Sequence, residues 1–230
     1  MAKAENHLIK LLPKADRIRL QACCEPVDLA LSQVLCERGA SIEHVYFPVH
    51  GFISLLTGVD DHASLEVGMV GRESMLGAEL VLGMLQSPWR ALVQGPGAAW
   101  RVGRVAFSQE LARSQALREV LQRNLRVVLA QMASSAACLR FHLIQPRLAR
   151  WLLMSADRAH GPQFHVTHEF LAGMLGVRRV GITVAASALQ RAGFITYRRG
   201  EVTVLDRRGL EGAACSCYAS ERLAYQAALG

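Results

Sequence analysis

The stretch that begins at Thr167 constrains the fold of this chain more than any other. Thr167 suits the N-cap of a helix, since its hydroxyl can accept a hydrogen bond from an unpaired backbone amide, and Gly176 can end that helix in the left-handed conformation. A second apolar stripe at helical spacing runs over about 178–192. The β-branched and aromatic runs Phe194–Tyr197 and Glu201–Leu205 then flank a turn. Together these features predict a winged helix-turn-helix.

The positive charge of this stretch lies where DNA would need it. Two arginines open the second helix and two more occupy the hairpin tip. Such positions suit a helix in the major groove and a wing on the phosphates. A helix pair with a hairpin also occurs in domains that bind no nucleic acid. The positions of the arginines are what favours DNA binding. The predicted contacts are Arg178, Arg179, Thr183 and Ser187 from the helix and Arg198 and Arg199 from the wing.

Composition supports two modest domains and a polyanionic partner. The chain has 230 residues, 51% of them apolar and 20% charged, which is enough to bury two cores. Its net charge of +7 is uneven, because residues 141–230 hold 11 Arg against 6 acidic residues. The sequence lacks a run of about 18 apolar residues and a signal-peptide pattern. We therefore expect a cytoplasmic protein that does not span a membrane.

The N-terminal part has the pattern of an antiparallel barrel or jelly roll. Short strand-like runs recur about every ten residues between Gly-containing turns. These runs are Val27–Leu31, Gln33–Cys36, Val45–Pro48, Phe52–Leu56, Ser64–Val70, Arg90–Gln94 and Ala98–Val102. The Gly-rich loop 71–83 interrupts them and can start a short helix, whose N-terminus would suit an anion.

Residues 107–140 form the longest helical pattern, and its apolar positions repeat with alternating spacings of four and three. The pattern fits a two-helix dimer seam, although a helix packed on its own domain would show a similar stripe. Dimerisation would also present two helix-turn-helix units to two half-sites. The predicted seam consists of Leu121, Leu125, Val128, Met132 and Leu139.

Phe141–Pro146 interrupts the helical pattern, because proline suits the first turn of a helix and not its interior. We predict a hinge here. The predicted organisation is α+β: a sensor β-roll over 1–106, a dimerisation helix over 107–140 and a winged helix-turn-helix over 141–230.

In this order of elements the chain resembles the Crp/Fnr family of bacterial transcription regulators over nearly its whole length. The strongest match is residues 171–200, and 39–51 resemble the first half of the family's sensor roll. The resemblance implies a homodimer that binds a palindromic operator, contacts RNA polymerase and has no enzymatic activity. Arg179 matches the family's base-reading arginine. Val180 and Val184 replace charged residues and would make apolar contacts, so we expect a different operator.

The phosphate cassette of the cAMP-binding members is degraded here. Arg90 stands at the position of the phosphate-binding arginine, but Ala91 replaces the adjacent hydroxyl residue. An extra residue separates Gly77 from Glu79, where the family has Gly-Glu. A signal other than cAMP is therefore expected. A cAMP- or cGMP-responsive regulator with a modified cassette, in which these four residues bind the effector, is the alternative.

The cysteines and histidines leave redox- or haem-sensing members of the family as a further alternative. The chain has six cysteines, at 23, 24, 36, 138, 215 and 217. They lack the closely spaced N-terminal group of the iron–sulfur members, and no C-x2-C pair indicates a structural zinc site. We expect no bound metal. His44, His50 and His62 are candidate haem ligands.

Two other classes of protein are considered. An enzyme is disfavoured because the sequence shows neither a nucleophile–base pair nor a metal triad. An interaction protein whose wing has lost DNA binding would fail to bind random duplex at low salt.

Overall fold

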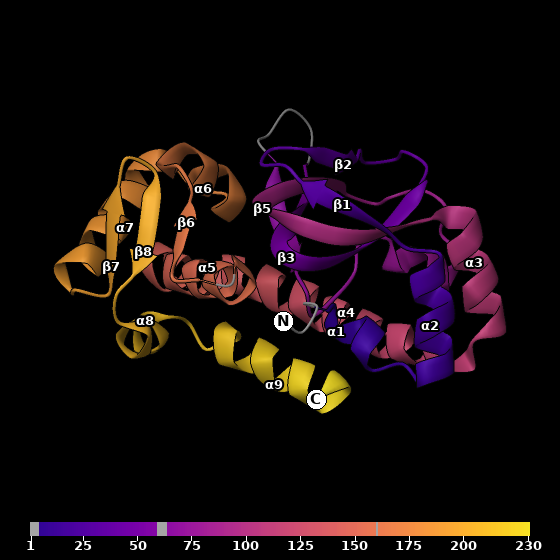
Figure 1. Ribbon diagram of the computed structural model, residues 1–230. Coiled ribbons are helices and arrows are strands. Elements are labelled where there is room, and N and C mark those ends of the chain that lie inside the picture. Colours follow the sequence, from indigo (N-terminus) through magenta and orange to yellow (C-terminus); the bar gives the residue numbers. More distant parts are fainter. Residues whose placement is uncertain (1–4, 59–63, 160) are drawn as a thin grey trace.

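The computed structural model describes residues 5–58, 64–159 and 161–230. It is an α+β structure in which an N-terminal antiparallel sheet domain and a C-terminal helix-turn-helix domain lie at the two ends of a central helical layer (Figure 1). The longest element of that layer is α4 (Gln115–Phe141).

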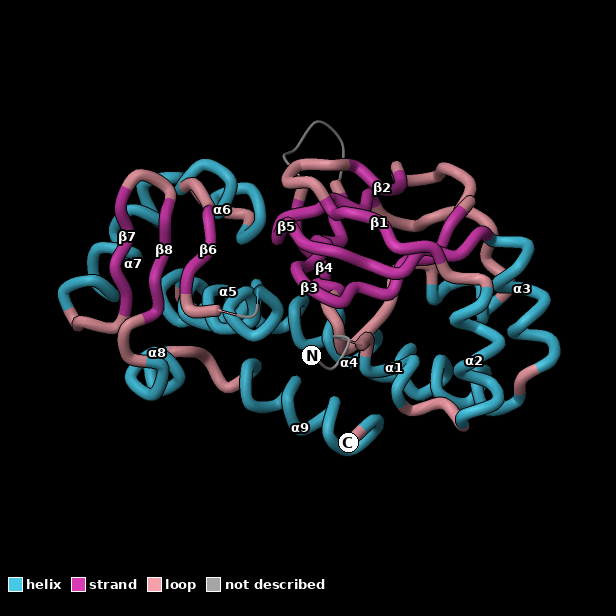
Figure 2. The backbone as a smooth tube through the Cα atoms, in the orientation of Figure 1, coloured by secondary structure: helices cyan, strands magenta, loops and turns pink. Residues whose placement is uncertain are grey.

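The N-terminal domain is a five-stranded antiparallel sheet with helices at one end (Figure 2). Strand order is β1-β5-β3-β4, and β2 also pairs with β5. Its elements are α1 (His7–Lys10), α2 (Lys14–Ala22), β1 (Glu25–Leu29), β2 (Val34–Cys36), β3 (His44–Thr57), β4 (Leu65–Val70), the 3₁₀ helix η1 (Ala78–Leu82), β5 (Arg90–Gly103) and α3 (Arg104–Arg113).

Two pairs of expected strands prove to be single long strands, β3 and β5. They pair along their whole length, and register shifts near Pro48 and Phe52 absorb the irregularity. The glycines that suggested interruptions allow two backbones to approach closely. A Cβ on Gly51 would lie 2.3 Å from the carbonyl oxygen of Gly95, and one on Gly97 would lie 2.2 Å from that of His50.

The expected single helix over 107–140 is two helices. Ser114 ends α3 in an extended conformation, and its Oγ accepts a hydrogen bond from Leu117 N at 3.0 Å to cap α4. The predicted interruption of the helical pattern is present: α4 ends at Phe141, and α5 (Ile144–Ala159) holds Pro146 in its first turn.

The C-terminal domain packs α5 against the helix-turn-helix and a small sheet of order β6-β8-β7. Its remaining elements are β6 (Gln163–His165), α6 (His168–Leu175), α7 (Arg179–Arg191), β7 (Ile195–Arg198), β8 (Glu201–Val204), α8 (Arg207–Ala213) and α9 (Cys217–Leu229). Sequence analysis anticipated neither β6 nor α9. Helix α9 returns across the molecule and packs along α4 (Figure 1).

Candidate DNA-binding site

Local signals shape the helix-turn-helix as predicted. Thr167 Oγ1 accepts a hydrogen bond from Phe170 N at 3.1 Å and caps α6, and Gly176 ends that helix with φ of 60°. Helices α6 and α7 are bent by 108° relative to each other, within the range usual for this motif. No single helix in the described part of the chain is long and apolar enough to cross a membrane; only this bent pair passes such a test together.

Helix α7 buries one face and leaves the predicted contact face open. Ile182, Ala185, Ala186 and Leu189 are at most 3% exposed and join the domain core. All eight residues predicted to contact DNA are exposed, and Val180 and Val184 are 66% and 62% exposed. Large apolar side chains on a surface are available for contact with another molecule. The structure thus places the helix contacts Arg178, Arg179, Val180, Thr183, Val184 and Ser187 on one surface.

The wing is braced against the recognition helix. Gln190 Oε1 accepts a hydrogen bond from Tyr197 N at 2.8 Å, so this glutamine anchors β7. Tyr197 Oη donates to the carbonyl of Val166 at 2.5 Å. At the tip, Arg199 and Gly200 both adopt positive φ, which folds the hairpin tightly and leaves Arg198 and Arg199 exposed.

Within the described residues, Arg178, Arg198 and Arg199 form no ion pair with a carboxylate, and Arg179 forms a weak one. Arg179 Nε lies 3.9 Å from Glu169 Oε2, and both side chains are more than two-thirds exposed. Such an exposed pair contributes at most about 1 kcal/mol, so DNA can displace it at little cost. Burial, aided by the charge of Arg179, lowers the pKa of His168 below its usual value. The surface therefore keeps the positive potential that a phosphate backbone requires.

The residues proposed for effector binding already have partners within the chain or lie in its interior. Arg90 Nε lies 3.2 Å from Glu37 Oε2, and Ala91 is fully buried in the apolar interior of the roll. Gly77, with φ of 91°, precedes η1, and burial raises the pKa of Glu79 to about 7. One oxygen of Glu79 has no hydrogen-bond partner in the described residues, so Arg90 and Glu79 are not joined through it.

Within the predicted dimer seam Leu121 is buried, and the other four residues are partly exposed. Leu121 is fully buried, Leu125 packs against the same cluster, and Met132 packs against the roll. Val128 and Leu139 line cavities between elements of the chain. The stripe also helps to hold the N-terminal sheet and α9 against α4.

The candidate haem ligands are not brought together. His44 and His50 lie six residues apart on β3, which separates them by roughly 20 Å along an extended strand. His62 lies outside the described residues.

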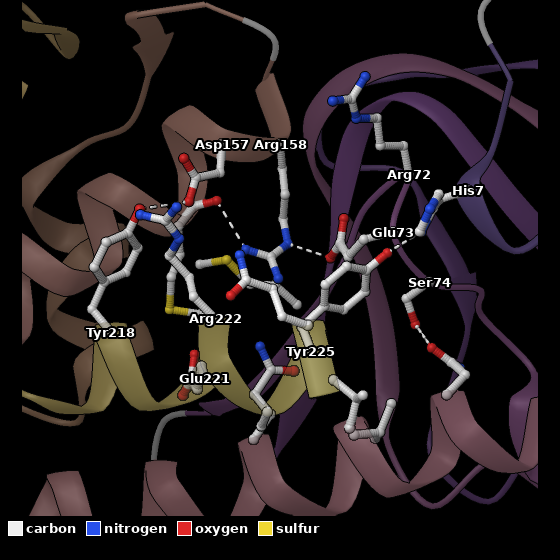
Figure 3. Close-up of a pocket in the computed structure, with 18 of the residues that line it drawn as sticks. His7, Arg72, Glu73, Ser74, Asp157, Arg158, Tyr218, Glu221, Arg222 and Tyr225 are labelled. Atoms are coloured by element: carbon white, nitrogen blue, oxygen red, sulfur yellow. Dashed lines mark hydrogen bonds and ion pairs between the residues drawn. The ribbon is translucent and has the colours of Figure 1, made fainter. Parts of the chain in front are cut away.

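A cavity of about 570 Å³ lies where the two domains meet α4 and α9. Figure 3 shows Arg158 reaching from α5 to Glu73 of the sensor domain, and this ion pair is 2.8 Å long. On the other side, Tyr218 Oη donates to Asp157 Oδ2 at 2.9 Å. His7 Nδ1 contacts the hydroxyl of Tyr225, so α9 also holds the N-terminal helix. This network connects the N-terminal sheet domain with the helix-turn-helix domain.

A second link between the domains is Glu66 on β4. Its oxygens accept hydrogen bonds from Ser54 Oγ at 2.6 Å and from Trp151 Nε1 of α5 at 2.9 Å. Burial raises the pKa of Glu66 to about 7 despite these two donors. Sequence analysis missed this residue, since a lone glutamate in a strand carries no signal of its partners.

We expect E66Q to be more stable than the wild type at pH 8, by about 1–3 kcal/mol. Because the pKa of Glu66 is higher in the folded chain, its contribution to stability is complete below pH 4.5 and falls as the pH rises towards 7. Glutamine keeps a hydrogen-bond acceptor but carries no charge. The difference in stability between E66Q and the wild type should therefore nearly vanish around pH 4.5. Urea denaturation at pH 4.5 and pH 8 measures this difference, and Glu119→Gln, at an exposed residue, is the control. If the stability of E66Q depended on pH as that of the wild type does, the raised pKa of Glu66 would be contradicted.

Comparison with known proteins identifies the helix-turn-helix domain and shows that solved structures share the fold of the whole chain. Residues 146–213 match the model of the Crp-like helix-turn-helix domain. The structure of FixK2 from Bradyrhizobium japonicum superposes with a TM-score of 0.70 at 14% identity, covering 84% of this chain and 98% of that one. A putative Crp/Fnr regulator from Eubacterium rectale gives 0.69 at 15% identity, covering 91% and 99%. A CRP-family transcriptional regulator from Thermus thermophilus gives 0.68 at 20% identity, covering 82% and 96%. No curated protein matches significantly.

Proposed function

We propose that this chain, a DNA-binding transcription regulator of the Crp/Fnr type, acts in the cytoplasm as a homodimer that binds a palindromic operator. The observation that carries the proposal is the exposure of all eight predicted contact residues on α7 and the wing. Arg179 would read a guanine edge, while Val180 and Val184 would contact thymine methyl groups. The arginines of the wing would bind phosphates.

A dimer requires a free face on α4, and one is present opposite the buried stripe. Leu129 is 64% exposed, and the helix also exposes Arg126 and Arg140. Between them lie four alanines that are not buried, Ala130, Ala133, Ala136 and Ala137. Small side chains at helical spacing allow two helices to approach closely. We assign the dimer contact to this alanine face in place of the predicted seam.

The signal is proposed to act on the sensor domain and to reach α7 through α4 and the hinge. Arg90 already pairs with Glu37, and Ala91 offers no hydroxyl, which favours a signal other than cAMP. The cavity between the domains is a second place where a signal would act, because residues of both domains line it. A change in the angle at residues 142–143 would alter the spacing of the two recognition helices, and DNA fixes that spacing at about 34 Å.

The proposal is tested by fluorescence anisotropy with random duplex and with an operator selected from random sequence by the purified chain. We expect salt-sensitive binding to both and tighter binding to the selected operator. Binding that is absent at low salt, or indifferent to added salt, would overturn the DNA-binding assignment.

Replacing Arg198 by alanine should weaken binding to operator and random duplex by a similar factor. A phosphate contact carries no sequence information, so its loss lowers the slope of log affinity against log salt by about 1. The slope is obtained from titrations at four or more salt concentrations. R113A is the matched control, because Arg113 is an exposed arginine on α3 in the sensor domain. An unchanged slope in R198A would place the wing away from DNA.

A further inference from the structure

Four side chains with metal-binding atoms converge where the long helix ends. Cys138 lies in the last turns of α4 and His142 caps that helix, while Cys215 and Cys217 flank the start of α9. Their candidate ligand atoms all lie within 4.8 Å of one another. Cys138 Sγ is 3.5 Å from Cys215 Sγ, and Cys217 Sγ is 3.6 Å from His142 Nδ1.

The two shorter distances match the edges of a tetrahedral ion site. With zinc bonds of about 2.3 Å to sulfur and about 2.0 Å to nitrogen, the edges of the tetrahedron measure roughly 3.5–3.8 Å. The ligands of an iron–sulfur cluster bind different irons and so lie farther apart. Three thiolates and one imidazole in tetrahedral array select zinc among common divalent ions. Because all four positions come from the protein, the site is of the closed, structural kind.

The three cysteines of this cluster are more buried than the other three cysteines of the chain. Cys138, Cys215 and Cys217 are 1%, 7% and 8% exposed and form a cluster of their own. By contrast, Cys23 is exposed and Cys24 and Cys36 are partly so.

The charge around the cluster is a second, independent observation. Arg147 and Arg150 are both buried, and together with Cys138 they line a cavity of about 30 Å³. Glu221 pairs with Arg150, but Arg147 has no ion-pair partner in the described part of the chain and contacts only a carbonyl, that of Leu175. A buried charge without a counter-charge is costly. Zinc with three thiolates and a neutral imidazole carries a net charge of −1, which would balance this arginine.

We propose that Cys138, His142, Cys215 and Cys217 bind one zinc ion, which fastens α9 to the end of α4. The ligands would come from a C-x3-H pair on one helical turn and a C-x-C pair more than 70 residues later. The expectation of no bound metal rested on the absence of a C-x2-C pair, whereas this set combines a C-x3-H pair with a C-x-C pair. The ion would sit beside residues 142–143, the joint between α4 and α5, and would fix the direction in which the DNA-binding domain leaves α4.

The first test is the metal content of the full chain purified without added chelator. Plasma mass spectrometry should find one zinc per chain in the wild type. A C23S/C24S/C36S variant is the matched control and should keep its zinc, whereas C215S and H142A should lose it. H142C, which restores a fourth zinc ligand, should bind zinc again.

A second measurement keeps the proposal decidable if C215S or H142A fails to fold. Wild-type protein is stripped with a chelator, its secondary structure is checked by circular dichroism, and cobalt(II) is titrated in. We expect intense visible d–d bands and a thiolate-to-cobalt charge-transfer band that saturate at one cobalt per chain and disappear when zinc is added. In the C217S variant these bands should weaken or change.

Three results would overturn the proposal. They are wild-type protein that keeps no zinc after incubation with zinc and gel filtration, iron with acid-labile sulfide in its place, and a Cys138–Cys215 disulfide found by mass spectrometry in protein purified under reducing conditions.

Discussion

R179A should bind the selected operator about ten- to a hundred-fold more weakly than the wild type, with little change on random duplex. Arg179 lies in the first turn of α7 with its side chain 70% exposed, where a guanidinium can reach a guanine edge. A bidentate contact of this kind contributes about 1–3 kcal/mol of discrimination. R179A should therefore reduce the ratio of operator affinity to random-duplex affinity.

The control for this experiment is R191A. Arg191 is an exposed arginine at the other end of the same helix, so its replacement removes one charge without touching the proposed reading surface. Anisotropy titrations on both duplexes give the specificity ratio for each variant. An equal loss by R179A on operator and random DNA would show that Arg179 contacts phosphate alone.

Ala133→Glu should convert the dimer to a monomer and lower operator affinity by at least a hundred-fold. It places a carboxylate in the middle of the alanine face of α4, where two copies would bring like charges together at close range. The monomer loses the second half-site, which contributes through effective concentration. Sedimentation velocity measures the oligomeric state, and circular dichroism checks that the substitution leaves the fold intact.

The matched variant is Leu121→Ala, on the stripe first predicted as the seam. Leu121 is fully buried within the chain, so its truncation should cost about 2–5 kcal/mol of folding stability and leave the folded fraction dimeric. If L121A dissociates the dimer without destabilising the chain while A133E remains dimeric, the original seam is correct and the alanine face is not the interface.

The sequence predicted correctly those features that depend on neighbouring residues, such as helix ends and the buried side of a helix. Thr167 and Gly176 act on backbone groups within a few residues of themselves, so the ends of α6 could be read directly. The periodicity of α7 likewise predicted which side is buried. The break at Ser114 was missed, because a serine between two amphipathic stretches does not interrupt the apolar pattern that was used to predict the helix.

Capping, turn chemistry and periodicity operate over a few residues, so the winged helix-turn-helix, the antiparallel N-terminal sheet and the basic surface could be predicted from the sequence. What each apolar stripe packs against depends on how distant elements fold together. The tertiary structure turned Leu121 towards the chain's own core and left Ala133 outside it, since α9 and the sheet occupy the other sides of α4. It also brought Cys138 within 3.5 Å of Cys215, 77 residues later in the chain, by folding α9 back along α4. Sequence spacing could not reveal that cluster, because packing between distant elements sets the distances between its atoms.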